Sequence, residues 1–124
     1  MNENPIYQKF LNENPSTGTL RIQIYMANQA IPIANVNVTI KKEIENQNFT
    51  IYEGKTDESG IINEIKLPAP IIKDNEMPNY TTYTLIVNHP SYQGPTTFSI
   101  PIYSNQKMIQ YVNLIPLFKE SKNE

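Results

Sequence analysis

The chain has 124 residues, no cysteine and a single histidine. Without cysteine it can form neither disulfide bonds nor cysteine-based zinc sites. His89 has no nucleophile and no orienting group that the sequence places beside it, so we interpret it as a turn or surface residue. The acidic residues Asp57, Glu58, Asp74 and Glu76 lack the alternating pattern of a calcium loop. The sequence therefore predicts no catalytic residue, no metal site and no cofactor.

A strong charge of one sign is also missing. The 10 basic and 12 acidic residues give a net charge of -2, and the lysines are scattered along the chain, so we expect no nucleic-acid partner. No apolar stretch approaches the ~20 residues of a membrane span. Met1–Pro5 is polar and acidic, whereas a secretory signal begins basic and continues apolar. These absences predict a chain without a membrane span that is cytoplasmic at synthesis.

The N-terminal residues 1–16 form a segment of their own. The sequence Asn-Glu-Asn-Pro occurs at Asn2–Pro5 and again at Asn12–Pro15. Asn4 suits a helix N-cap and Pro5 the first helical position. A helix between these repeats would be shorter than the ~12–15 residues that are marginally stable alone, so its apolar face needs a docking surface. We expect a helical arm that packs on its own chain or on a neighbouring subunit, and its predicted contact residues are Ile6, Tyr7, Phe10 and Leu11.

From Thr19 onward, apolar and polar residues alternate in short runs separated by turn residues. The first run, Thr19–Met26, alternates without a fault. After the Thr56–Gly60 turn, we expect Ile61–Leu67 to be a strand whose inward row is interrupted by Asn63. Met108–Leu117 is apolar on both faces in places, which is typical of an inner strand. The other predicted strands are Asn35–Lys41, Phe49–Tyr52, Tyr83–Val87 and Phe98–Ile102.

These patterns predict an all-β fold, a seven-stranded Greek-key β-sandwich over residues 17–118 with a charged tail over 119–124. The inward positions of the alternating runs form the expected core. They are Leu20, Ile22, Ile24, Val36, Val38, Ile40, Leu85, Val87 and Ile100.

Several short motifs also follow one another in a characteristic order. They are Gly18–Gln23, Ala30–Val36, Thr56–Gly60, Leu67–Pro70, Tyr83–Val87 and His89–Tyr92. In this order they resemble the transthyretin-like (prealbumin-like), or carboxypeptidase regulatory-like, sandwich. The resemblance implies the same two-sheet fold.

A narrower resemblance rests on further segments. They are Phe10–Pro15, Leu67–Pro70, Tyr80–Tyr83, Ile100–Tyr103 and Leu114–Leu117. Together they resemble the N-terminal domain of clostridial spore-cortex-lytic enzymes and related peptidoglycan-binding proteins. Those enzymes carry their hydrolytic and peptidoglycan-binding domains further along the polypeptide, so the resemblance transfers no lytic residue to this chain. It implies an association with the spore or cell envelope.

Three functions are compatible with this sequence. The leading hypothesis is a non-catalytic interaction or structural module, with a protein partner or self-association. The first alternative is a carbohydrate-binding module that recognises peptidoglycan through tyrosines near predicted strand ends, namely Tyr80, Tyr83, Tyr92 and Tyr103. The second alternative is an accessory or pro-domain-like partner of a separate spore-cortex-lytic enzyme.

Overall fold

The computed structural model describes residues 4–27, 29–73 and 78–117. The predicted tail over 119–124 and the acidic residues Asp74 and Glu76 lie outside the described residues. The elements are helix α1 (Pro5–Glu13) and strands β1 (Ser16–Met26), β2 (Ile31–Pro32), β3 (Asn37–Ile44), β4 (Gln47–Lys55), β5 (Ile61–Ala69), β6 (Tyr80–Asn88), β7 (Thr96–Tyr103) and β8 (Lys107–Asn113).

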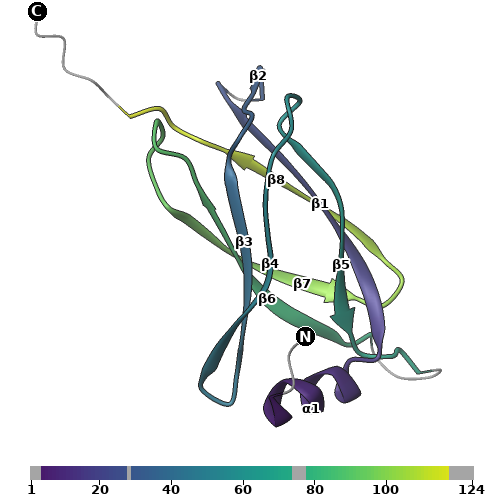
Figure 1. Ribbon diagram of the computed structural model, residues 1–124. Coiled ribbons are helices and arrows are strands. Elements are labelled where there is room, and N and C mark those ends of the chain that lie inside the picture. The colour runs from purple at the N-terminus through teal and green to yellow at the C-terminus, as the bar shows by residue number, and fades with distance from the viewer. Residues whose placement is uncertain (1–3, 28, 74–77, 118–124) are drawn as a thin grey trace, which may run out of the picture.

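The strands form two sheets. In one sheet, β1 is antiparallel to β5 and β2 and parallel to β8. The other sheet has the order β4-β3-β6-β7, and all its pairs are antiparallel. Helix α1 lies at one end of the sandwich, while β2 and the turn before β5 lie at the other (Figure 1). The predicted all-β sandwich with a short N-terminal helix is confirmed. The described residues add an eighth strand, the two-residue β2.

The core is the one predicted from the alternating runs. Every residue predicted for it is at most 1% exposed. Burying a large aliphatic side chain contributes roughly 1.5–3 kcal/mol, so this shared interior is the main source of stability. Helix α1 joins the same core through Phe10.

Local sequence explains where α1 begins. Asn4 Oδ1 accepts a hydrogen bond from the Ile6 backbone N–H at 2.8 Å, and Pro5 occupies the first turn. The N-cap predicted from the sequence is therefore present. Ile6 itself is half-buried at the start of the helix.

The predicted inward row of β5 needs a correction. A β-bulge lies opposite Arg21, because Leu20 pairs with Ile65 and Ile22 pairs with Ile62. The extra residue reverses the alternation, so Ile62 faces the core in place of the predicted Ile61. Asn63 therefore marks a bulge, which strict alternation could not anticipate.

The residues of the Thr56–Gly60 turn form hydrogen bonds that stabilise the fold. Thr56 is buried, and its Oγ1 donates to the Ile33 carbonyl at 2.7 Å and accepts from the Val36 N–H at 3.0 Å. Asp57 Oδ1 accepts hydrogen bonds from the backbone N–H groups of Ser59 and Ile61. These bonds connect the turn to the segment before β3 and to the first residue of β5.

Gly60 completes this turn for two reasons. Its φ is +75°, which L side chains rarely adopt. A Cβ added there would also collide with the backbone carbonyl oxygen of Ile24. The Thr56–Gly60 motif, one of the six on which the resemblance rests, is therefore explained by backbone geometry.

Candidate functional site

The aromatic face of α1 packs on its own sandwich. The ring of Phe10 meets the ring of Tyr83 edge-on, with centroids 6.4 Å apart, and Phe10 is only 5% exposed. The ring centroids of Tyr7 and Phe49 lie 5.3 Å apart, and Leu11 is partly buried against the core. Of the two docking arrangements expected for the arm, the structure has the intramolecular one. Most of the predicted contact face is therefore used within the chain.

Tyr83 lies inside the sandwich. It is 1% exposed, and its hydroxyl donates to the Pro68 carbonyl oxygen at 2.5 Å. Burial, and to a smaller extent the nearby Tyr7, raises the pKa of Tyr83 above the ordinary value of 10.0. Lys42 Nζ lies 5.9 Å from the Tyr83 ring centroid and donates to the Thr82 carbonyl at 2.7 Å. Tyr83 therefore presents no ring to a sugar.

The remaining tyrosines of the predicted sugar-binding surface divide into two places. Tyr80 and Tyr103 face each other across β6 and β7, with ring centroids 5.2 Å apart, and Tyr80 is 48% exposed. Tyr92 lies in the turn that follows β6, where its hydroxyl donates to Met26 Sδ at 3.3 Å and its ring contacts His89. The structure thus brings together Tyr80 and Tyr103 but not all four residues.

A groove of about 440 Å³ lies beside Tyr80, between the end of α1 and the adjoining ends of β3 and β6. Its lining residues include three glutamates and one lysine, namely Glu13, Glu43, Glu45 and Lys42. A hydrogen bond from the Thr81 hydroxyl to Asn14 Oδ1 joins the two sides. The groove combines an aromatic ring with hydrogen-bond acceptors, which suits a polar ligand such as a sugar or a cationic peptide.

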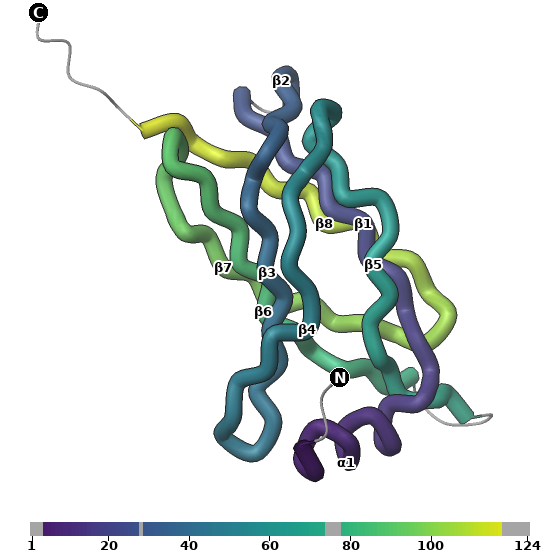
Figure 2. The backbone as a smooth tube through the Cα atoms, in the orientation of Figure 1, coloured from purple at the N-terminus to yellow at the C-terminus, as the bar shows by residue number. Residues whose placement is uncertain are grey.

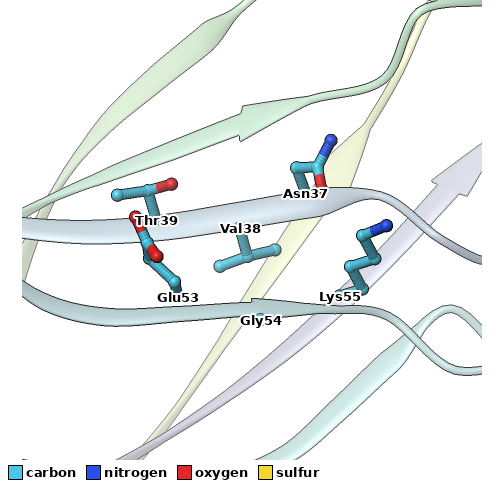
Figure 3. A pocket seen from close by; sticks show the side chains of 6 residues that line it. All are labelled: Asn37, Val38, Thr39, Glu53, Gly54 and Lys55. Carbon is cyan, nitrogen blue, oxygen red and sulfur yellow. The ribbon is translucent and has the colours of Figure 1, made fainter.

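A second hollow of about 440 Å³ lies over β3 and β4 (Figure 3). Its polar lining consists of the cross-strand pairs Asn37–Lys55 and Thr39–Glu53. The ring of Tyr52 occupies the space beside Gly54, where a Cβ would otherwise lie. This hollow is the open surface between two rows of paired side chains and contains none of the predicted site residues.

His89 and Asp57 each accept hydrogen bonds that hold a turn. His89 Nδ1 accepts a hydrogen bond from the Ser91 backbone N–H at 3.1 Å, in the turn where the sequence placed it. Asp57 holds the turn before β5. Among the described residues, no three histidine or acidic side chains are grouped so that they could hold a metal ion.

One surface of the molecule was not predicted from the sequence. Strand β8 pairs only with β1 in the described part of the chain, so the prediction of an inner strand is wrong and β8 is an edge. After β8 the chain turns toward the connection between β6 and β7, where Tyr92 pairs with Pro116 (Figure 2). The apolar outward residues of β8 and of the segment after it are exposed by 41–54%; they are Ile109, Tyr111, Ile115 and Leu117. We call these four residues the C-terminal apolar strip.

The apolar pattern on both faces of β8 was the available signal for this strip. Sequence alone does not show which strands are flanked on both sides, because pairing depends on tertiary topology. Arg21 and Gln23 of β1 lie next to Ile109 and Tyr111 in the register. The two apolar side chains therefore have polar neighbours on the outer face.

Solved structures support the fold. No family model matches the chain, and no curated protein sequence matches it. The Bacillus anthracis TIE protein is 24% identical with a TM-score of 0.61, and the match covers 82% of this chain and 18% of that one. GBS52, the minor pilin of the gram-positive pathogen Streptococcus agalactiae, is 14% identical with a TM-score of 0.60, over 88% of this chain and 48% of that one. Klebsiella pneumoniae 5-hydroxyisourate hydrolase is 16% identical with a TM-score of 0.52, and the match covers 77% of this chain and 90% of that one.

These similarities concern the fold alone, a β-sandwich of two sheets. The chain spans 18% of the length of the first of these proteins and 48% of the second. The same architecture occurs in a pilin and in a hydrolase, so it does not by itself separate a structural role from an enzymatic one. No described helix has the length and apolar character that crossing a membrane requires.

Proposed function

We propose that this chain is a non-catalytic β-sandwich module that acts by contact with protein. The observation that carries the proposal is the C-terminal apolar strip, whose residues are 41–54% exposed. Large apolar side chains that are exposed along one edge of a folded domain mark a candidate interaction surface. The N-terminal arm does not provide this surface, because its Phe10 side chain is buried in the core.

The setting that we propose is the spore or cell envelope. This part rests on the resemblance of the sequence to the N-terminal domain of spore-cortex-lytic enzymes. A role as a partner of a separately encoded enzyme of that kind is one form of the same proposal. The similarity to a pilin is compatible with a structural use of this fold in the envelope.

A second candidate function is recognition of peptidoglycan. Here the supporting observation is the Tyr80–Tyr103 pair, with ring centroids 5.2 Å apart beside a groove of about 440 Å³. Exposed tyrosine rings can stack on sugars, while the groove offers hydrogen-bond acceptors. This candidate uses a different surface from the C-terminal apolar strip, so the two can be separated by mutation.

Sedimentation with insoluble cortex peptidoglycan distinguishes these functions. For a protein-contact module we expect the wild-type chain to stay in the supernatant and to release no reducing ends. Sedimentation that is lost in Tyr80→Ala/Tyr103→Ala but kept in Tyr25→Ala, on the other sheet, would establish the carbohydrate alternative. Release of reducing ends above the protein-free rate would contradict a non-catalytic role.

A further inference from the structure

The free edge of β8 has a defined set of outward backbone groups. Thr19 N–H donates to the Gln106 carbonyl at 2.9 Å, and Leu114 N–H donates to the Tyr25 carbonyl at 2.7 Å. In a parallel ladder, alternate residues of a strand bond to the same neighbour, so the even-numbered residues of β8 bond to β1. The N–H and C=O groups of Ile109 and Tyr111 therefore point away from the sheet, and the Tyr111 carbonyl accepts a hydrogen bond from Gln110 Nε2 at 3.0 Å.

The apolar side chains at this edge are not part of an internal cluster. Ile109 is 41% exposed and Tyr111 is 49% exposed. Their neighbours on β1 are engaged elsewhere, because the Arg21 guanidinium donates to Asn63 and Gln23, with donor–acceptor distances of 2.7 and 2.8 Å. Covering Ile109 and Tyr111 would remove apolar surface from water without breaking these bonds.

The other four edge strands carry features that oppose pairing with another chain. Strand β2 has only two residues, one of which is Pro32. Strand β4 has a bulge and exposed charges at Glu53 and Lys55. Strand β5 has a bulge and Pro68, and β7 contains Pro101, which lacks a backbone donor. Strand β8 pairs with β1 in an unbroken register, contains no proline and no carboxylate, and has a single charged residue, Lys107, at its first position. Among the described edges, β8 is the one open to a further strand.

The sequence of β8 is symmetric in polarity about its centre. From Lys107 to Asn113 it reads polar, apolar, apolar, polar, apolar, apolar, polar, with Gln110 in the middle. An antiparallel copy turned about Gln110 therefore places polar residues opposite polar ones and apolar residues opposite apolar ones. Such self-complementarity is the condition for an interface with twofold symmetry.

We propose that β8 pairs with β8 of a second copy of this chain, antiparallel and centred on Gln110, which joins the two β1-containing sheets into one. Ile109 then lies opposite Tyr111 of the second copy, and the outward backbone groups of both residues form the ladder. Met108 lies opposite Val112 of the second copy on the inner face. An aromatic ring beside a β-branched side chain is a favourable cross-strand pair. This inference rests on the proposed function, since it names the protein partner as a second copy.

Charge substitutions test both the surface and the register. The Ile109→Lys/Tyr111→Lys variant places like charges opposite each other across the twofold axis, so we expect the mass in sedimentation equilibrium to fall from twice 14.3 kDa to 14.3 kDa. The Ile109→Glu/Tyr111→Lys variant places opposite charges there and should keep the doubled mass at low salt. Ile71→Lys, at a 57% exposed loop residue, is the control and should not change the mass.

A cysteine at the centre gives a second test that requires only a folded chain. Residues on the proposed axis form a pair without ladder hydrogen bonds, whose Cα atoms lie about 4.5 Å apart, within the range that a disulfide bridges. Because the natural sequence has no cysteine, oxidised Gln110→Cys should give a covalent dimer. The control, Thr84→Cys, lies exposed on the other sheet and should give much less.

Three results would overturn the proposal. They are a wild-type mass of 14.3 kDa up to millimolar concentration, a dimer that survives Ile109→Lys/Tyr111→Lys, and cross-linking of Gln110→Cys no stronger than that of Thr84→Cys. A monomeric wild type would leave the proposed contact function in place with another partner. Peptidoglycan turnover or tyrosine-dependent sedimentation would instead remove the proposed function without affecting the dimer.

Discussion

At the scale of single residues, the most distinctive sequence motif serves the fold. Thr56 is buried and bonded on both sides, so Thr56→Val, which keeps the volume, should lower the free energy of unfolding by about 1–3 kcal/mol. The reason is that the Ile33 carbonyl and the Val36 N–H each lose a partner. Chemical denaturation measures this change. Thr84→Val, at an exposed position, is the control, and an equal loss there would contradict the explanation.

Tyr83 gives a prediction for alkaline pH. Burial, followed by the nearby Tyr7, raises the folded-state pKa of Tyr83 above 10.0, so the unfolded chain releases this proton first as the pH rises. The stabilisation is complete below about pH 10 and falls as the pH rises toward the folded-state pKa. In Tyr83→Phe the stability should therefore decline less between about pH 9 and pH 11 than in the wild type. Denaturant midpoints at the two pH values test this, with Tyr80→Phe as the exposed control.

Tyr83 also shows how far residue roles could be predicted. Tyr83 shares one face of its predicted strand with Leu85 and Val87, but only Leu85 and Val87 were predicted for the core. Counting tyrosines near strand ends instead suggested a surface ring. Tyr83 is only 1% exposed, so its place on the same strand face as Leu85 and Val87 gives its location and its position near a strand end does not. The place of a residue in an alternating run indicates whether its side chain faces the core. The residue type alone does not, because tyrosine occurs both in the core and at the surface.

At the scale of elements, α1 belongs to the core. Phe10→Ala should lower the free energy of unfolding by about 3 kcal/mol, because it removes a buried ring that packs on Tyr83. The helix is too short to persist without this contact. Thermal and urea unfolding measure the change, and the exposed Asn12→Ala on the same helix is the control. A loss below about 1 kcal/mol would show that the docked arm contributes little.

The sequence predicted where the strands lie better than it predicted which strands pair with each other. Alternation located β1 and β3 and their buried rows, because one face of each strand is apolar. It failed at Asn63, where a bulge shifts the register, and at β8, where two apolar faces suggested an inner strand. Bulges and strand neighbours depend on contacts between distant segments, so a local pattern does not contain them. The exposed edge was the larger omission, since it carries the proposed contact surface.

At the scale of the whole molecule, assembly and stability should be coupled if β8 pairs with a second copy. Folding then includes association, so mass action raises the thermal midpoint of the wild type as the protein concentration rises. Scanning calorimetry over a hundredfold concentration range should show this increase. Ile109→Lys/Tyr111→Lys should unfold at a midpoint independent of concentration, because its β8 edges repel each other. Equal concentration dependence in both proteins would mean that the two chains meet elsewhere, whereas a flat wild-type midpoint with a monomer mass would leave the β8 edge for a different partner.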